Sequence, residues 1–410
     1  MTPMNSLEIE IKSGQNGRYP VTISYRPVGD FEVARGGELV WEGVERELRQ
    51  VGDDRQAYGE VLGRALFQDV IRDTWMQARR DSEGGVRVLL NVEAPELKGF
   101  QWERLCAPSG GSGAWRHLHT DQRAVFSWYL PSANERRFPP IGRMDLGALV
   151  VLANPPADNQ AGLARVDGEA TIAAARRGLG EIPTTVLAHV EGADGVPTVD
   201  NVLRHLSEGR YTILHLIAHG YHNEEKGKSY IYFVDETGER VEPVTATTII
   251  ERFDNLAGGK LPYFIFLCTC DSAKGEGEGA LGGIGQRLVR ELGVPAVVAM
   301  TEQISVATAE VLTTPFYEQL RAHGEVDRAL VAGLAGVMGA GDVLVPAVFG
   351  RLGERPLFSD SLERPLTDKE IVAGLARMKT LVPERAPILW TDFVGAVQKV
   401  QPTLGVGTGG

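Results

Sequence analysis

The sequence predicts an α/β fold for residues 139–358, in which a mostly parallel sheet is covered by helices on both faces. Apolar runs of strand length alternate along the chain with segments whose apolar residues recur three and four positions apart, the spacing of a helix. The strand segments are almost continuously apolar, which is typical of parallel strands buried on both faces. The predicted strands are 146–154, 184–191, 211–220, 262–270 and 294–300, with a hairpin at 229–242; the predicted helices are 168–182, 199–209, 247–256, 284–292, 306–322 and 326–337.

Residues 1–138 form a separate α+β region in this prediction. Alternating apolar residues on both sides of the turn SGQNG predict a hairpin over residues 7–26. Residues 41–80 then change to helical spacing, and 86–93 read as a strand. Phe100, Trp102 and Leu105 in the following loop are expected to anchor its packing.

Residues 359–410 are predicted to be a third segment, with a helix at 367–379 and a glycine-rich end, TLGVGTGG, typical of a linker. Two interpretations of this end remain open. The chain continues into a longer protein, or it has a frayed tail.

Composition limits the function classes. The formal net charge is −12 and the basic residues form no stripe, so direct nucleic-acid binding is not expected. The apolar runs are far shorter than the roughly 20 residues that span a bilayer, and the start, MTPMNSLEIE, does not resemble a signal peptide. Three cysteines (Cys106, Cys268 and Cys270) are too few for a disulfide framework, so we expect a protein of the reducing cytoplasm.

Two predicted strands end in residues that can take part in catalysis: one ends in His219-Gly220 and the other in Cys270-Asp271. Ligands of open α/β sheets bind outside the carboxyl ends of the strands, so these side chains are expected to meet at one crevice. A thiol beside an imidazole that titrates near neutral pH is the requirement for a Cys–His nucleophile pair. His219 precedes Cys270 by about 50 residues, the separation found in caspases.

Several segments resemble, in order, those of the CHAT family, the caspase-like peptidases allied to separases. They are FQWERLCAP, ILHLIAHG with the following hairpin and helix, IFLCTCDSAKGEGEG, AVVAMTEQISVATAEVLTTPFYEQL and VLVPAVFGRLGERPLF. The likeness covers roughly residues 7–358. It implies a caspase-like fold and a cysteine endopeptidase that cuts protein substrates. It also implies a role in bacterial signalling or antiviral defence, in which a sensor or activator, as a domain or a subunit, switches the protease on.

The resemblance assigns roles to individual residues. Cys270 would be the nucleophile and His219 the general base and acid. The backbone N–H groups of Gly220 and Cys270 would form the oxyanion hole. No cofactor or metal is implied.

The resemblance also suggests the substrate pocket. Cys268, two residues before the nucleophile, would line the pocket for the residue that precedes the cut bond. Glu302 lies where separases have an acidic pocket residue, and it would favour Arg or Lys there by charge pairing. The segment MTEQIS departs from the family's usual Leu-Trp-Pro-Val, with Thr301 in place of the Trp. Asp271 would add negative potential to the cleft, or would simply be solvated.

Alternatives remain for most of these residues. Cys270 could be a buried core cysteine, and Cys106 is expected to be structural. His215, His219 and His222 with the two later cysteines suggest a metal site, but His215 is predicted within a strand and His222 in the following loop, positions that disfavour a shared site. The glycine-rich stretch after Cys270 lacks the Gly-Lys-Ser/Thr ending of a phosphate-binding loop and is interpreted as a flexible loop that orders on activation.

At the level of function, two alternatives stand beside a protease. One is an interaction module that has kept the sheet and lost the chemistry. The other is a hydrolase or transferase that uses the same two residues on a small molecule.

Overall fold

The computed structural model describes residues 3–109, 113–132, 138–159, 161–223, 225–256, 259–269 and 283–359. The chain divides into two compact units. Residues 1–138 with 147–357 form the larger, and 139–146 with 358–410 form the smaller. In the smaller unit, Gly142 pairs with Ser359, and the Arg143 guanidinium lies over the Phe358 ring. The predicted helix 367–379 and the tail 403–410 lie outside the described residues.

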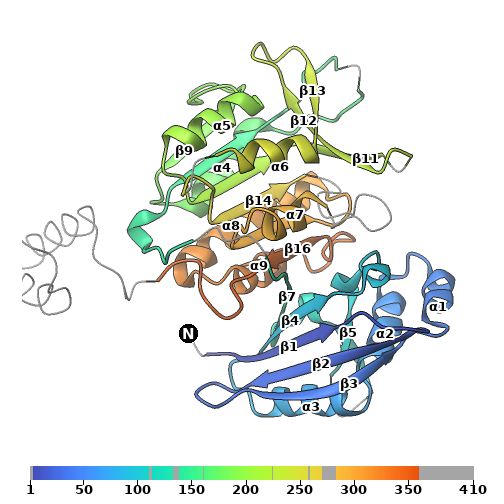
Figure 1. The fold of residues 1–410 in the computed structure, drawn as a ribbon. Helices are drawn as coiled ribbons and strands as arrows, with labels where there is room; N and C mark the ends of the chain where they lie inside the picture. The colour runs from blue at the N-terminus through green and yellow to red at the C-terminus, as the bar shows by residue number, and fades with distance from the viewer. Residues whose placement is uncertain are drawn as a thin grey trace, which may run out of the picture. The chain divides into compact units, whose positions relative to one another are not determined.

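One large sheet organises the larger unit. Its strands are β1 (Asn5–Ile11), β2 (Arg18–Arg26), β3 (Val33–Val40), β4 (Val86–Val92), β7 (Ala124–Tyr129), β8 (Ala148–Leu152), β9 (Thr184–Ala188), β10 (Ile213–Ile217), β14 (Phe264–Cys268), β15 (Ala296–Met300) and β16 (Pro346–Gly350). Their order across the sheet is β3-β2-β1-β4-β7-β16-β15-β14-β10-β8-β9 (Figure 1).

Most neighbouring strands of this sheet run parallel, which confirms the predicted fold class. The exceptions are β1 with β2, β2 with β3, and β15 with β16. Two small antiparallel sheets accompany the large one. They consist of β11 (His219–Asn223) with β12 (Lys228–Val234) and β13 (Val241–Thr245), and of β5 (Cys106–Pro108) with β6 (Trp115–His117).

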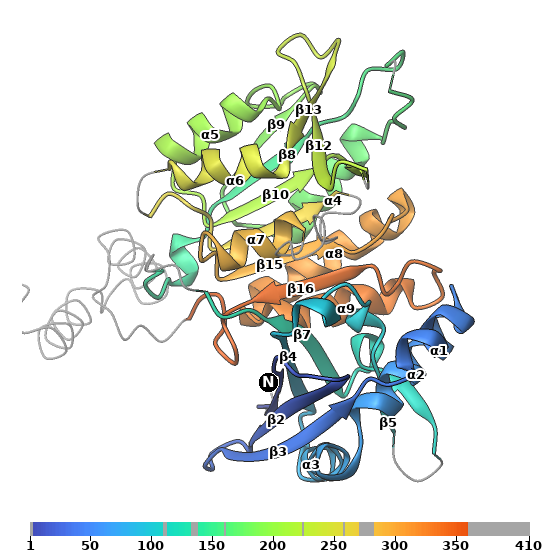
Figure 2. The same cartoon turned by 45° about the vertical axis from the view of Figure 1, so that its right-hand side comes forward.

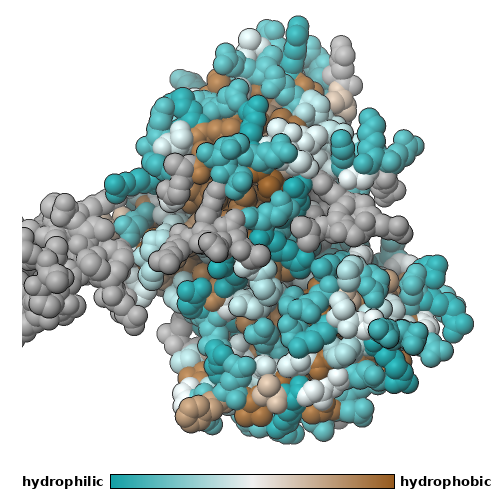
Figure 3. Space-filling view, viewed as in Figure 1, coloured by the Kyte–Doolittle hydropathy of each residue, from teal (hydrophilic) through white to brown (hydrophobic). Residues whose placement is uncertain are grey.

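Helices cover the sheet. They are α1 (Val44–Val51), α2 (Arg55–Leu66), α3 (Asp69–Arg80), α4 (Gly168–Leu179), α5 (Val199–Glu208), α6 (Ala246–Asp254), α7 (Ile284–Arg290), α8 (Val306–His323) and α9 (Val326–Leu334). Beside the strands from β16 to β9, α5, α6 and α7 lie on one face and α4, α8 and α9 on the other (Figures 1 and 2). On the face that Figure 3 shows, hydrophilic side chains predominate and apolar ones gather mostly in recesses.

Local sequence explains where several helices begin. At the start of α2, α4, α5, α6 and α8, a side-chain oxygen accepts a hydrogen bond from the backbone N–H three residues on. These caps satisfy an N–H that lacks a partner within the helix. The capping residues are Asp54, Asp167, Thr198, Thr245 and Ser305.

The strands of residues 1–138 belong to the same sheet as those that follow. The junction is β7, which the sequence did not predict; it pairs with β4 on one side and β16 on the other. Trp128 stacks on Phe349 there, with ring centroids 6.1 Å apart. Nearby, the buried Arg87 of β4 pairs with Asp327 of α9, at 2.5 Å from Nε to Oδ2. The division at residue 138 stays a prediction, and the two sides of it share one continuous ladder of hydrogen bonds.

No helix in the described part of the chain is long and apolar enough to cross a bilayer.

Candidate active site

Two neighbouring parallel strands lead to the predicted catalytic residues. In the register of β10 and β14, Ile217 lies opposite Cys268. The strand ends are joined further by the Ala218 N–H, which donates to the Cys268 carbonyl at 3.3 Å. His219 follows Ile217 by two positions, and Cys270 follows Cys268 by two. Cys270 itself lies outside the described residues, so its pairing with His219 stays a prediction.

His219 is held by a backbone carbonyl. It begins β11, is partly exposed, and its Nε2 lies 2.6 Å from the carbonyl oxygen of Ala164. A carbonyl oxygen can only accept, so Nε2 carries the hydrogen of this bond and Nδ1 is the acceptor of the neutral ring. The carbonyl therefore fixes both the tautomer and the orientation of the imidazole, as the third member of a catalytic triad does.

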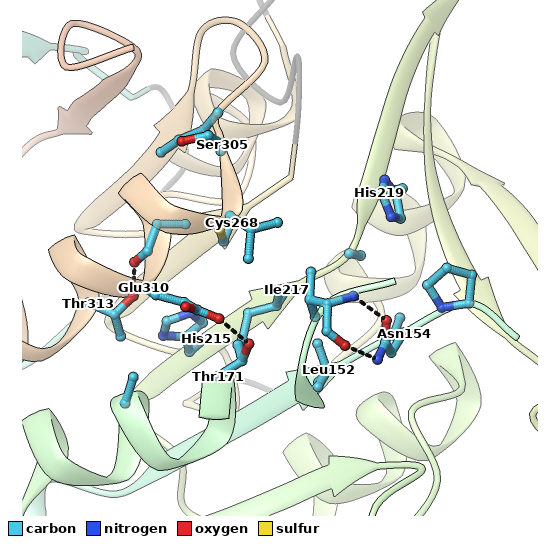
Figure 4. Close-up of a pocket in the computed structure, with 18 residues that line it drawn as sticks. Leu152, Asn154, Thr171, His215, Ile217, His219, Cys268, Ser305, Glu310 and Thr313 are labelled. Atoms are coloured by element: carbon cyan, nitrogen blue, oxygen red, sulfur yellow. Dashed lines mark hydrogen bonds between the residues drawn. The ribbon is translucent and has the colours of Figure 1, made fainter. Parts of the chain in front are cut away.

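The loop that supplies this carbonyl is shaped by two asparagines. Asn154 donates from Nδ2 to the Val166 carbonyl at 2.9 Å, and its Oδ1 accepts from the Val166 N–H at 3.1 Å (Figure 4). Asn159 makes the same pair of bonds to Leu163, each at 2.8 Å. Since Ala164 lies between these two fastened positions, its carbonyl is held by side chains that sequence reasoning had not singled out.

His215 is a core residue. It is 1% exposed, its ring stacks on Phe266 at 4.8 Å, and Nδ1 lies 2.8 Å from the Tyr317 hydroxyl. Burial lowers the pKa of His215 to about 3, so the ring is neutral at physiological pH. A neutral ring with an occupied nitrogen and no solvent access is poorly suited to proton transfer, which leaves His219 as the candidate base.

A pocket lies between α4 and α8 beside these histidines (Figure 4). Its empty space amounts to about 710 Å³ when the open mouth is included. His219 and Cys268 line it together with apolar side chains. Close helix packing forms its walls, since Gly178 of α4 leaves room for Thr314 and Tyr317 of α8, which a Cβ would meet at 2.8 Å.

The pocket contains polar groups that the sequence analysis missed. Glu310 of α8 accepts a hydrogen bond from the Thr171 hydroxyl of α4 at 3.2 Å, and both line the pocket (Figure 4). Cys268, at the end of β14, also lines it and is partly exposed. In the sequence, Glu310 lies eight residues after Glu302 within a helical pattern, and nothing there distinguishes the two carboxylates. The packing of α8 against α4 shows that Glu310 is the one that lines the cavity.

Glu302 is engaged elsewhere. Its carboxylate accepts from Arg55 Nη2 and Gln101 Nε2, each at 2.9 Å, and pairs closely with Arg104. Glu302 is not among the described residues that line the pocket. Its predicted role in substrate specificity is therefore a hypothesis that has to be tested against a structural role.

The remaining predicted residues are placed only in part. Gly220 lies on β11 opposite Ile231 of β12, next to His219. Asp271, like Cys270, lies outside the described residues. The oxyanion hole and the negative potential of Asp271 therefore stay predictions.

Cys106 forms an unexpected Cys–His contact, with its sulfur 3.4 Å from His117 Nδ1. Cys106 is fully buried, and burial raises the pKa of its thiol to about 12. The His117 Nδ1 also lies 2.8 Å from the Arg104 carbonyl, which accepts the ring hydrogen. This thiol stays protonated and out of reach, as a structural cysteine does.

The histidines that suggested a metal site have other partners. Nδ1 of His222 lies 2.9 Å from the Ser229 hydroxyl, and His215 is bonded to Tyr317. In the part of the chain that the structure describes, no group of three or more His, Cys, Asp or Glu side chains is arranged to hold a metal ion.

Comparison with known proteins assigns the chain to a family. The family description "CHAT domain" matches residues 56–395, most of the chain. The chain belongs to the CHAT family. This family is related to the caspase-like cysteine peptidases, so the resemblance seen in the sequence is confirmed.

The remaining comparisons add little to the CHAT assignment. Among solved structures, the chain is similar to a complex of Porphyromonas gingivalis RgpB pro- and mature domains, with 16% identity, 77% of each chain covered and a TM-score of 0.42. No curated protein matches this CHAT chain.

Proposed function

We propose that this CHAT protein is a cysteine endopeptidase that cuts protein substrates with Cys270 as nucleophile and His219 as general base and acid. The observation that carries the proposal is the register of β10 and β14. His219 and Cys270 each follow a paired position, Ile217 and Cys268, by two residues on neighbouring parallel strands. The carbonyl that fixes the His219 ring supports the same role.

The proposed reaction has two steps. The Cys270 thiol gives its proton to His219 Nδ1, and the thiolate attacks the carbonyl carbon of the cut peptide bond. Nδ1 is the atom assigned to proton transfer, because Nε2 donates to the Ala164 carbonyl. When the tetrahedral intermediate collapses, the C–N bond breaks and the imidazolium protonates the leaving amine.

Hydrolysis of the thioester completes the cycle. The neutral His219 takes a proton from water as the water oxygen attacks the acyl carbon, the C–S bond breaks, and the imidazolium returns that proton to the Cys270 sulfur; the carboxylic acid product then ionises in solvent. In both steps the developing oxyanion would be stabilised by the N–H groups of Gly220 and Cys270.

The proposed setting is a regulated protease of the bacterial cytoplasm. The CHAT family and the low cysteine content support it. We expect a sensor or activator, as a domain or a subunit, to switch the enzyme on in signalling or antiviral defence. The glycine-rich run after Cys270 lies outside the described residues; the sequence-based proposal that it orders on activation is tested by hydrogen exchange there, compared with and without an activator.

An active-site-directed probe tests the chemistry. A peptidyl acyloxymethyl ketone should alkylate Cys270, located by mass spectrometry, and the labelling rate should fall at least tenfold in His219→Ala. Cys268→Ser is the matched thiol control and should keep the label on Cys270. Equal labelling with and without His219 would favour an interaction module.

The substrate class needs a second measurement. N-terminal peptide profiling of a bacterial lysate should reveal new protein termini with the wild type and none with Cys270→Ala. Labelling at Cys270 without any new termini would favour the small-molecule hydrolase.

A further inference from the structure

The described carboxylate in the pocket beside His219 belongs to one side chain, Glu310. Among the described residues that line it, Glu310 is the one carboxylate, and none is Lys or Arg. The rest of the lining is mainly apolar, with the hydroxyls of Thr171 and Thr313 and the buried ring of His215. A carboxylate at the edge of an apolar pocket attracts a cation more strongly than it does in water, because the local dielectric constant is lower.

Glu310 keeps acceptor capacity for a ligand. The Thr171 hydroxyl bonds to Oε1 at 3.2 Å and holds the side chain toward the cavity (Figure 4). A carboxylate has about four lone-pair positions, so one bond from a hydroxyl leaves most of them available. No Lys or Arg in the described part of the chain forms an ion pair with Glu310.

Two neighbouring groups could oppose a cation, and neither does so strongly. Arg177 of α4 lines a second depression together with Glu310, but it does not line the pocket beside His219. The N-terminus of α8 is at the rim, at Ser305, and a helix N-terminus favours anions. The Asp342 carboxylate already occupies this end, accepting from the Ser305 N–H and the Thr308 hydroxyl, each at 2.7 Å.

We infer that Glu310 is the specificity residue of this pocket and that the pocket takes a side chain with an apolar stem and a cationic end, Lys or Arg, directly before the cut bond. The inference rests on the proposed protease function, because His219 and Cys268 on the pocket wall are what connect the pocket to bond cleavage. The apolar walls would contact the methylene stem, and Glu310 would pair with the charged head. Glu310 takes over the role that the sequence analysis gave to Glu302.

Binding of small probes tests the pocket without any cleavage. n-Butylguanidinium and n-butylurea have nearly the same shape and differ in charge. At low salt the Cys270→Ala protein should bind the cation at least tenfold more tightly, a difference of about 1.4 kcal/mol, because only the cation forms a charge-assisted hydrogen bond with Glu310. In Glu310→Gln the two affinities should become equal, and in Glu318→Gln, an exposed glutamate of the same helix, the preference should be unchanged.

Cleavage gives the second readout. With peptides that differ only in the residue before the cut bond, kcat/KM for Arg should exceed that for its neutral isostere citrulline at least tenfold. Glu310→Lys should shift the ratio toward a Glu substrate, and thermal unfolding verifies that each variant is folded.

The outcomes separate the two proposals. Equal binding of the two probes to the wild type, or a cation preference that survives in Glu310→Gln, overturns the pocket assignment. A preference that depends on Glu310 supports it, even if no peptide is cut. In that case the protease function fails and the cation pocket stands.

Discussion

Replacement of Glu302 by Gln separates a structural role of this residue from a role in specificity. The Glu302 carboxylate receives Arg55 Nη2 and Gln101 Nε2, each at 2.9 Å, together with Arg104. The Arg104 side chain is only 7% exposed, so its charge depends on this partner. The amide of Gln keeps one acceptor but turns an NH₂ group toward the guanidinium groups.

The expected loss of stability follows from these contacts. Removing one partner of a buried ion pair costs about 3–5 kcal/mol. The Glu302 side chain is 23% exposed and Arg55 is 27% exposed, so water screens part of the pair. We therefore expect the free energy of unfolding to fall by about 2–4 kcal/mol in Glu302→Gln, since each hydrogen bond to a charged group contributes about 1.5–3 kcal/mol.

Urea unfolding followed by tryptophan fluorescence measures this loss, because Trp102 is fully buried beside the cluster. Glu318→Gln, an exposed glutamate on α8, serves as the matched control and should unfold like the wild type. The reasoning is refuted if Glu302→Gln unfolds at the wild-type urea concentration while its preference for Arg over citrulline before the cut bond is lost. That result would return Glu302 to the substrate pocket.

Three further variants test other parts of the structure. Asp327→Asn should lower the free energy of unfolding by about 3 kcal/mol, since Arg87, 6% exposed, loses a two-point contact; unchanged urea unfolding would contradict this. Asn154→Ala should lower kcat/KM about tenfold, because the loop that orients His219 loosens, and should lower the free energy of unfolding by about 1–3 kcal/mol through two lost hydrogen bonds; equal rates would contradict this. Burial raises the pKa of Glu103 to about 7 from 4.5, so the folded protein holds a proton that the unfolded chain has released. The contribution of Glu103 to stability should therefore fall by up to about 3 kcal/mol between about pH 4.5 and 7, and the difference in free energy of unfolding between the wild type and Glu103→Gln, measured by urea unfolding at several pH values, should change by that amount.

The strands that the sequence predicted are those with strong apolar patterns. The strands β8, β10 and β15 are buried along their whole length, and that burial is what a continuous apolar run indicates. By contrast, β3 contains Gly36-Gly37 and only its Leu39 is buried, and β11 has the sequence HGYHN. Both strands form because they pair with a neighbouring strand, and their composition is not typical of strands, so no local sequence pattern predicted them.

The candidate site divides in a similar way. The residue types His219 and Cys270, and their place after neighbouring strands, follow from the order of apolar runs along the chain. The support for the His219 ring comes from the Ala164 carbonyl, more than 50 residues earlier in the chain, and any residue can provide a backbone carbonyl. A contact of this kind has no signature in the sequence.

The sequence by itself determined the mostly parallel α/β sheet, the family and the two residues proposed for catalysis, because alternating hydrophobic periods and strand-end chemistry are local properties. Only the tertiary structure decided which acidic residue faces the pocket. Glu302 and Glu310 are alike as residues, yet Arg104 packs against the first and Thr171 of α4 against the second. The packing of helices and the sheet junction at β7 bring together segments far apart in the chain, and this long-range geometry assigns each carboxylate its partner.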